Sequence, residues 1–394
     1  MAEELSLRER VLASPVRRIH MLAWRDLDDP EAGGSEIHAH AIASRWADAG
    51  LRVTMRTSYA AGRAQDIERA DYRVVRKAGR YLVFPRAIAS EVAGRMGPSD
   101  GLVEIWNGMP FFSPLWYRGP RIVLLHHVHA EMWRMVLPPK LARFGELVEY
   151  RLAPPVYRDT DIVTLSRSSK ADMVEQLGFD PARIHVVNPG IDGRFSPLGG
   201  DSNVATDVGR SETPLVAAVG RLVPVKRWDL LIAALAQLKQ QHPQLRAVIA
   251  GEGYEREALQ QQRSALGADD WLDLPGRISD DALVDLYRRS WLVASSSVRE
   301  GWGMTLTEAA ACGTPAVATD IPGHRDSVID GVSGILTASP TGLAGAMDTV
   351  ISDQATRHAL SKGAYEASKA YSWGAAAAEI FSVLNSVSER NHRT

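Results

Sequence analysis

Residues 295–315, SSSVREGWGMTLTEAAACGTP, are the most informative segment of the chain. The apolar run WLVA at 291–294 precedes it and predicts a buried strand. Glu300 then lies in a glycine-rich loop, and Glu308 lies two turns along a helix that begins near Met304. A strand, a glycine-rich loop and a helix in this order are typical of a parallel sheet covered by helices.

The loop around Glu300 predicts a site for an anion. Gly301 and Gly303 allow the backbone to approach a ligand closely, and the first N–H groups of the following helix have no acceptor within that helix. A helix start of this kind binds phosphate well. In an open α/β sheet the loop also lies at the carboxyl end of a strand, where ligands usually bind.

A basic loop comes earlier in the same half of the chain. Arg221 and Lys226 lie in the segment GRLVPVK at 220–226, directly after a predicted strand at 215–219. Arginine offers a fork of donors and lysine a point charge, so both suit a diphosphate. Taken alone, such side chains are usually solvent-exposed charges. Their place after a strand favours a ligand site instead.

The alternation of strands and helices extends along the chain and restarts once. The first half has predicted strands at 18–24, 53–58, 101–106, 122–125 and 161–165, with a helix at 35–50. After a polar stretch the pattern restarts, with a strand at 215–219 and a helix at 228–241. The predicted parts are a first domain at 16–198, a linker at 199–213, a second domain at 214–371 and a C-terminal helix at 372–394 that packs back across the domains.

Composition supports a two-domain protein without a membrane span. The chain has 394 residues, of which 45% are hydrophobic and 23% charged, and its net charge is −2, so nucleic-acid binding is not expected. No apolar stretch reaches the roughly 18 residues of a transmembrane helix, and the acidic N-terminus is unlike a signal peptide. We expect a cytoplasmic protein, with peripheral membrane contact left open. A single cysteine, Cys312, excludes an internal disulfide framework.

Taken together, these motifs resemble one enzyme family. The pattern G-R-x4-K, followed by E-G-x-G-x4-E and A-x-G-T-P, resembles the retaining glycosyltransferases of family four. That resemblance covers about residues 18–336 and is most specific from 220 to 323. It implies the GT-B fold, in which two doubly wound, Rossmann-like parallel-sheet domains face a central cleft. It further implies that the first domain binds the acceptor and the second binds a nucleotide sugar.

The resemblance also implies roles for residues of the second half. Glu300 would approach the donor sugar, and Glu308 would hold the ribose hydroxyls. Arg221 and Lys226 would bind the diphosphate. The implied backbone contacts are the helix-start amides of Gly303, Met304 and Thr305, and a base-binding segment at Arg277 and Ile278.

In the first half the resemblance selects a glycine pair and a histidine. Gly33 and Gly34 open a helix in a G-G-x-E pattern, where they would lie against the donor diphosphate or the acceptor. His126 follows the predicted strand at 122–125 and would contact the donor sugar. His127 and His129 are the alternatives for this role.

Two metal patterns are considered and rejected. Asp26-Leu27-Asp28 matches D-x-D, the metal-binding pattern of another glycosyltransferase fold, but it lies in the first loop rather than beside a nucleotide site. The three histidines after 122–125 lack the carboxylate or cysteine that would complete a zinc site. We therefore expect no metal and no cofactor other than the donor substrate.

The sequence thus predicts a hexosyltransferase. It would move a sugar from a nucleotide diphosphate donor, with UDP- or GDP-sugars favoured, to a small-molecule, glycan or lipid-linked acceptor. His126, Glu300, Arg221 and Lys226 would be catalytic in a metal-independent front-face substitution that retains the anomeric configuration. A nucleotide-sugar sensor or scaffold without turnover and a sugar-nucleotide epimerase of similar fold remain as alternatives. Dinucleotide oxidoreduction is disfavoured, because no G-x-G-x-x-G follows the first strand of either half.

Overall fold

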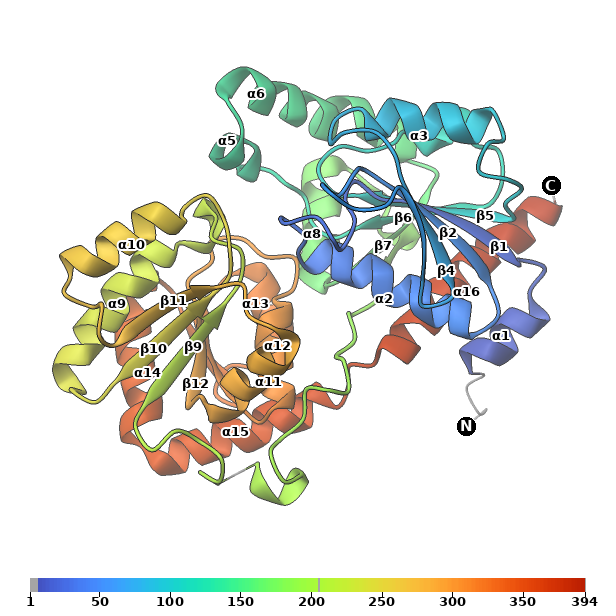
Figure 1. The fold of residues 1–394 in the computed structure, drawn as a ribbon. Coiled ribbons are helices and arrows are strands. Elements are labelled where there is room, and N and C mark those ends of the chain that lie inside the picture. The colour runs from blue at the N-terminus through green and yellow to red at the C-terminus, as the bar shows by residue number, and fades with distance from the viewer. Residues whose placement is uncertain (1–5, 205, 394) are drawn as a thin grey trace. The chain divides into compact units, whose positions relative to one another are not determined.

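The computed structural model describes residues 6–204 and 206–393. It divides the chain into an N-terminal unit, Met1–Gly190 together with Ser372–Thr394, and a C-terminal unit, Ile191–Tyr371. Each unit is a sheet covered by helices (Figure 1). The division at Gly190 falls before the polar stretch 197–214, so the predicted linker lies inside the C-terminal unit. The C-terminal helix belongs to the N-terminal unit.

The N-terminal unit contains an eight-stranded sheet with the order β3-β4-β2-β1-β5-β6-β7-β8. Neighbouring strands are parallel except for the antiparallel edge pair β3 and β4. The strands are β1 (Arg18–Leu22), β2 (Arg52–Thr57), β3 (Asp66–Arg69), β4 (Tyr72–Arg76), β5 (Gly101–Trp106), β6 (Arg121–Leu125), β7 (Asp161–Thr164) and β8 (Ile184–Val186). The helices are α1 (Leu7–Ala13), α2 (Gly34–Asp48), α3 (Val83–Val92), α4 (Ser113–Trp116), α5 (Met132–Val136), α6 (Pro139–Leu147), α7 (Ala153–Tyr157), α8 (Arg167–Leu177) and α16 (Trp373–Arg393).

The C-terminal unit contains a six-stranded parallel sheet with the order β11-β10-β9-β12-β13-β14. The strands are β9 (Leu215–Val219), β10 (Arg246–Ala250), β11 (Leu272–Gly276), β12 (Leu292–Ser295), β13 (Ala316–Thr319) and β14 (Gly334–Thr337). The helices are α9 (Trp228–Gln241), α10 (Arg256–Ala265), α11 (Asp280–Arg289), α12 (Met304–Ala311), α13 (Pro322–Ser327), α14 (Leu343–Ser352) and α15 (Gln354–Ser368). Both sheets confirm the predicted α/β class, and β9 and α9 have the predicted bounds.

Strand order places the loops that matter for function. In each sheet the first strand of the parallel pattern is central, and later strands are added first on one side and then on the other. The order therefore reverses between β1 and β5 in the N-terminal unit and between β9 and β12 in the C-terminal unit. Loops that leave the carboxyl ends of strands at such a switch point diverge and leave room for a ligand.

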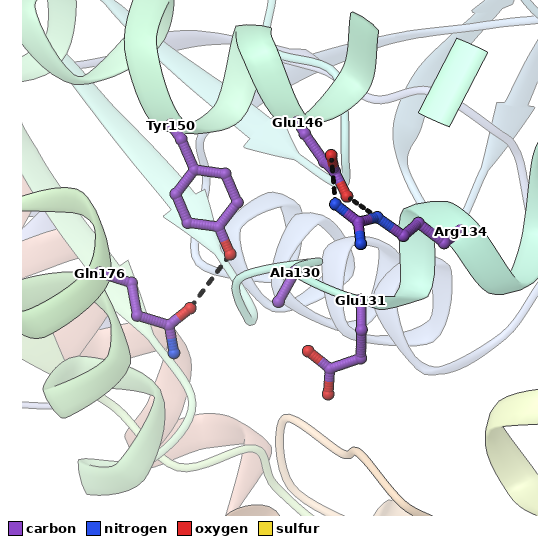
Figure 2. A pocket seen from close by; sticks show the side chains of 6 residues that line it. All are labelled: Ala130, Glu131, Arg134, Glu146, Tyr150 and Gln176. Carbon is purple, nitrogen blue, oxygen red and sulfur yellow. Dashed lines mark hydrogen bonds and ion pairs between the residues drawn. The ribbon is translucent and has the colours of Figure 1, made fainter. Parts of the chain in front are cut away.

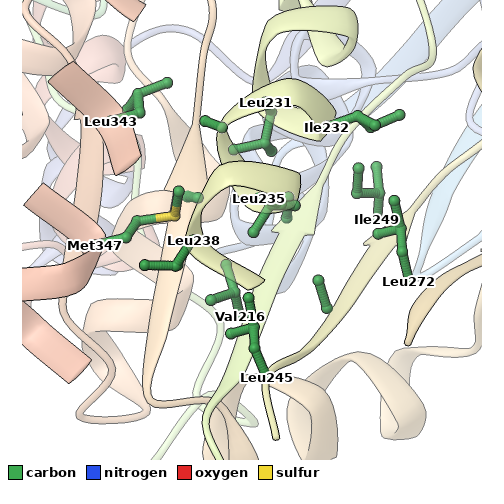
Figure 3. Close-up of a cluster of buried hydrophobic side chains, with 14 of the residues drawn as sticks. Val216, Leu231, Ile232, Leu235, Leu238, Leu245, Ile249, Leu272, Leu343 and Met347 are labelled. Atoms are coloured by element: carbon green, nitrogen blue, oxygen red, sulfur yellow. The ribbon is translucent and has the colours of Figure 1, made fainter. Parts of the chain in front are cut away.

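Apolar periodicity builds the main core of the C-terminal unit. Leu231, Leu235 and Leu238 recur on one face of α9 and are buried against the sheet. Figure 3 shows this face of α9 packed beside Ile249 of β10 and Met347 of α14. Complete burial of one such side chain stabilises the fold by about 1.5–3 kcal/mol. A second cluster in the same unit encloses Cys312 together with other apolar residues.

The C-terminal helix α16 completes the N-terminal unit. It packs against α2, where the Trp46 indole donates a 2.9 Å hydrogen bond to the Ala377 carbonyl and meets Phe381 edge to face. At its start, the backbone of Trp373 lies so close to Gly190 that a Cβ on Gly190 would fall 2.1 Å from the Trp373 nitrogen. The two points where the chain passes between units are therefore in contact.

Gly190→Ala is expected to destabilise the protein, because the added methyl meets backbone atoms that cannot rotate away. Overpacking of this kind costs about 1–3 kcal/mol in the free energy of unfolding, and chemical denaturation measures it. Gly193→Ala is the matched control, since a Cβ there meets nothing within 4 Å. Equal stability of the two variants would contradict the close contact.

Candidate functional site

The C-terminal unit brings Lys226 and Glu300 together at its switch point. Lys226 follows β9 and Glu300 follows β12, and these strands are neighbours in the sheet. The Lys226 Nζ lies 2.5 Å from Glu300 Oε1, and the two side chains are 19% and 16% exposed. Two residues that the sequence assigned to one site are therefore joined in a partly buried ion pair.

Hydrogen bonds between the two loops hold this pair in place. The Ser296 hydroxyl lies 2.8 Å from the carbonyl oxygens of both Lys226 and Arg227, which share its single proton. The Val298 amide donates to the Val225 carbonyl at 3.0 Å. Because these bonds involve backbone atoms, they fix the loop conformation whatever the lysine side chain does.

The charge of Glu300 is set by opposing effects. Burial alone raises the pKa of its carboxyl, but the positive charge of Lys226 and a 2.8 Å hydrogen bond from Ser297 outweigh this effect. The net pKa is lowered, so Glu300 is a carboxylate at neutral pH. A stable negative charge therefore stands beside the cationic loop.

Helix α13 packs against the backbone of Glu300. The sequence did not predict this contact. A Cβ on Gly323 would fall 2.3 Å from the Glu300 carbonyl oxygen, so only glycine allows this approach. The next residue, His324, is buried, with Nδ1 2.8 Å from the Thr319 carbonyl and Nε2 3.2 Å from the Ser295 hydroxyl. Nδ1 must donate to the carbonyl, so Nε2 accepts from Ser295.

Helix α12 begins at the site as predicted. Gly303 precedes it with φ at +109°, a left-handed conformation that glycine adopts without strain. The first helical bonds run from the Leu306 and Thr307 amides to the Gly303 carbonyl. The amides of Met304 and Thr305 come before them and have no acceptor within the helix.

Glu308 lies on α12 in an environment that disfavours charge. Burial raises the pKa of its carboxyl to about 8, and the Tyr287 hydroxyl donates a 3.3 Å hydrogen bond to Oε2. Most of the carboxyl is therefore protonated at neutral pH. In this form it can both donate and accept hydrogen bonds.

The remaining predicted residues of this unit lie in other surroundings. Arg221 is half-buried in the loop after β9, and its carbonyl accepts a 2.9 Å bond from the Trp228 indole. Arg277 is exposed after β11, which lies two strands away from β9. Ile278 packs against the apolar cluster around Leu215. The structure thus unites Lys226 with Glu300 but shows no contact that tests Arg277 or Ile278.

At the switch point of the N-terminal unit, the start of α2 is fixed by two bonds. The Gly33 amide donates to Glu36 Oε2 at 2.8 Å, and Gly34 is the first residue of the helix. Asn107, just after β5, donates from Nδ2 to the Ser35 hydroxyl at 2.9 Å. The loops after β1 and β5 are therefore tied together.

Among the three histidines after β6, His126 differs in its surroundings. It is buried, its Nε2 lies 3.1 Å from His38 Nδ1, and burial lowers its pKa to about 4. His127 and His129 stack on each other with ring centroids 4.9 Å apart, and His129 also contacts Trp133. The pairing with His38 was not predicted, because it joins two residues far apart in the sequence.

Both aspartates of the D-x-D segment form ion pairs with arginines. Asp26 lies 2.8 Å from Arg69 and 2.6 Å from Arg76, while Asp28 lies 3.0 and 2.5 Å from the same two guanidinium groups. The pKa of Asp26 is lowered, because contacts with His40 and Arg69 outweigh its burial. Within residues 6–204 and 206–393, no group of three or more His, Cys, Asp or Glu side chains could hold a metal ion.

A cavity of about 430 Å³, lined mainly by residues with polar or charged side chains, lies near the loop after β6. Figure 2 shows its lining, in which Arg134 is paired with Glu146 and the Tyr150 hydroxyl donates to Gln176. Ala130 and Glu131 complete the lining.

Among residues 6–204 and 206–393, none of the helices combines the length and the apolar composition that a membrane span requires.

The raised pKa of Glu308 should make the stability of the protein depend on pH. The pKa of its carboxyl in the folded protein, about 8, lies above the ordinary value of 4.5. The folded protein therefore holds the carboxyl proton more tightly than the unfolded chain does. The free energy of unfolding should therefore fall as pH rises from about 5 to about 8. Glu308→Gln removes this effect, so its Tm relative to the wild type should rise over that range.

Thermal unfolding at several pH values measures the difference. Glu257→Gln, an exposed residue of α10, is the control and should show a constant offset. A constant offset for Glu308→Gln as well would show that Glu308 is ionised in the folded protein.

The sequence of the chain is similar to those of known glycosyltransferases. Residues 206–367 match the family model described as glycosyl transferases group 1, and residues 32–194 match that of glycosyltransferase family 4. The D-inositol 3-phosphate glycosyltransferase of Salinispora tropica is 35% identical over 59% of this chain and 52% of its own length. The enzyme of the same description from Kribbella flavida is 29% identical over 91% of this chain and 93% of its own. The chain thus spans about half of the first relative and nearly all of the second.

Solved structures show the same fold at low sequence identity. Sucrose-phosphate synthase from Thermosynechococcus elongatus has a TM-score of 0.77 and 19% identity, covering 93% of this chain and 98% of its own. Anabaena HepE in complex with UDP-glucose has a TM-score of 0.71 and 19% identity, covering 96% and 100%. The two family models match successive parts of the chain, residues 32–194 and 206–367, and together cover most of it. The chain therefore belongs to the group 1 and family 4 glycosyltransferases and has their GT-B fold.

Proposed function

We propose that the protein transfers a hexose-type sugar from a nucleotide diphosphate donor to an acceptor hydroxyl, with retention of the anomeric configuration. The observation that carries the proposal is the Lys226–Glu300 pair, which stands at the switch point beside the start of α12. The site combines a fixed carboxylate with a cation and helix-start amides. These are the groups that a sugar and a departing diphosphate need.

The donor would bind to the C-terminal unit. Arg221, Lys226 and the amides of Gly303, Met304 and Thr305 would hold the diphosphate. Glu308, protonated at neutral pH, would accept from and donate to ribose hydroxyls. Backbone atoms of Arg277 and Ile278 would meet the base. In support, a structural neighbour, Anabaena HepE, is described in complex with UDP-glucose.

Lys226 would change partners when the donor binds. Without a ligand its ammonium group neutralises Glu300. A diphosphate carries more negative charge and would draw the flexible lysine away, since the loop bonds at Ser296 fix only the backbone. Glu300 would then be left ionised near the anomeric carbon. Donor binding and activation of the carboxylate would thus be coupled.

The chemical step would be a front-face substitution. The bond between the anomeric carbon and the leaving phosphate oxygen breaks, and a bond from the acceptor oxygen forms on the same face. The acceptor proton passes to the leaving diphosphate, whose charge Arg221 and Lys226 stabilise. Glu300 and His126 would stabilise oxocarbenium-like charge on the sugar. No metal enters this scheme.

The acceptor would bind to the N-terminal unit, near Gly33 and Gly34 at the start of α2. A small polyol phosphate is the first candidate, because the relatives named above are described as D-inositol 3-phosphate glycosyltransferases. A glycan or a lipid-linked hydroxyl is the alternative class. The polar lining of the cavity in Figure 2 suits hydroxyl groups and makes it a candidate acceptor subsite.

The first experiment follows release of nucleoside diphosphate from UDP-, GDP-, ADP- and dTDP-sugars, with chelator present and with or without inositol 3-phosphate. We expect turnover of one donor. Glu300→Gln should lower kcat roughly 10²-fold, the size of one lost transition-state contact, and change donor affinity less. Glu257→Gln should retain the wild-type rate.

Two outcomes would contradict this role. Loss of donor binding in Glu300→Gln with unchanged turnover of bound donor would assign Glu300 to binding alone. Thermal stabilisation by a donor that is never turned over, with any acceptor, would favour a nucleotide-sugar sensor or scaffold.

Lys226→Met should weaken binding of the nucleoside diphosphate product. Loss of one charge-assisted hydrogen bond costs about 1.5–3 kcal/mol, so Kd should rise by roughly 10- to 100-fold. Calorimetric titration measures this change. Lys362→Met, an exposed lysine of α15, is the control and should leave Kd unchanged. An unchanged Kd in Lys226→Met would exclude the lysine from the diphosphate site.

A further inference from the structure

Two histidines from distant parts of the N-terminal unit form a buried pair. His38 lies on α2, His126 follows β6, and both rings are almost fully buried. His126 Nε2 and His38 Nδ1 are 3.1 Å apart, and the rings meet edge to face at 86° with centroids 4.9 Å apart. The proposed reaction gives His38 no role.

The pair has a simple proton inventory. Burial lowers the pKa of both rings, so both are neutral and each carries one N–H. One proton must lie between His126 Nε2 and His38 Nδ1 for a hydrogen bond to form. Whichever ring donates it, the outer nitrogens, His126 Nδ1 and His38 Nε2, are left as one donor and one acceptor.

Both outer nitrogens are buried and have no hydrogen-bond partner among the described residues. An unsatisfied buried polar atom costs about 1–3 kcal/mol, and native structures keep few of them. A ligand atom at His126 Nδ1 would remove that cost at one end of the pair. The orphaned nitrogen therefore points to a ligand rather than to core packing.

The ring of His38 is held on two sides. Helix α2 is anchored at its start by the Asn107–Ser35 and Gly33–Glu36 bonds. The indole of Trp373, at the start of α16, lies 5.7 Å from the His38 ring. His38 is therefore a rigid partner, able to fix the rotation of a neighbouring ring.

We propose that His38 is a positioning residue for His126. By engaging Nε2, it fixes the ring of His126 and leaves Nδ1 as the nitrogen that meets the donor sugar. Its own tautomer decides whether Nδ1 offers a proton or a lone pair. This inference rests on the proposed function, in which His126 contacts the sugar.

Substitutions at His38 separate positioning from packing. The side-chain amide nitrogen of asparagine is as many bonds from Cα as the histidine Nδ1, and that of glutamine is as many bonds away as the histidine Nε2. Phenylalanine keeps an aromatic ring but has no nitrogen. We expect kcat to fall roughly 10- to 100-fold in His38→Phe and His38→Gln, as for a misplaced reacting group, with a smaller change in the KM for donor. His38→Asn should recover most of the rate. Equal rates in the Asn and Gln variants, at equal Tm, would overturn the proposal.

Two further variants make the outcomes distinct. His40→Gln is the control, since His40 lies on the same helix with its Nε2 facing Asp26, and it should retain the rate of the folded enzyme. If His126→Ala keeps full activity, the proposed function of His126 fails and the positioning role fails with it. If His126→Ala is inactive while a folded His38→Phe is fully active, positioning alone is overturned.

A measurement without turnover completes the test. The imidazole ¹⁵N signals of His126 report which nitrogen carries the proton and what it contacts. The Nε2 signal should shift in His38→Phe and in His38→Gln and return toward the wild-type position in His38→Asn. An unchanged signal in all three variants would overturn the proposal. Should His38→Phe not fold, the comparison of Asn with Gln carries the test.

Discussion

The ion pair between Lys226 and Glu300 is the interaction around which the C-terminal unit is arranged. A partly buried carboxylate loses hydration, and an unpaired one would take up a proton instead. Lys226 keeps it charged, and the hydroxyl of Ser296 keeps the lysine loop within reach. Gly323 then brings α13 against the same loop. The contacts of Lys226 and Ser296 cross the switch point between β9 and β12, and Gly323 joins the loop after β12 to the helix after β13, so the fold and the electrostatics depend on one another.

Buried glutamate side chains hold loops in place in the N-terminal unit by accepting several hydrogen bonds each. Glu149 accepts from the amides of His129 and Ala130 and from the Trp133 indole, at 2.7, 3.1 and 2.9 Å. Glu104, on β5, accepts from the Phe111 amide and the Tyr157 hydroxyl. Each fixes a loop at the carboxyl edge of the sheet. Loops that would otherwise be mobile are thereby given a defined shape.

Sequence reasoning succeeded where the signal was local. The apolar run of β9 and the amphipathic pattern of α9 gave their bounds, and the motifs gave Lys226 and Glu300. It did not predict that these two would pair, because the pairing depends on strand order. It missed β3, whose sequence DIER is polar because the strand lies at the sheet edge. The predicted linker at 199–213 lies inside the C-terminal unit. Arg210, within this polar stretch, donates hydrogen bonds to the Gly313 carbonyl and the Thr314 hydroxyl and so ties the stretch to that unit.

The burial of Cys312 has a practical consequence. The thiol lies within an apolar cluster, and burial raises its pKa to about 12, so almost no thiolate exists at neutral pH. Thiol reagents attack the thiolate, and the chain has no other cysteine. A cysteine introduced on the surface of each unit would thus be labelled without background from the natural chain. Fluorescent or spin labels could then measure the distance between the units in solution, with and without a bound nucleotide.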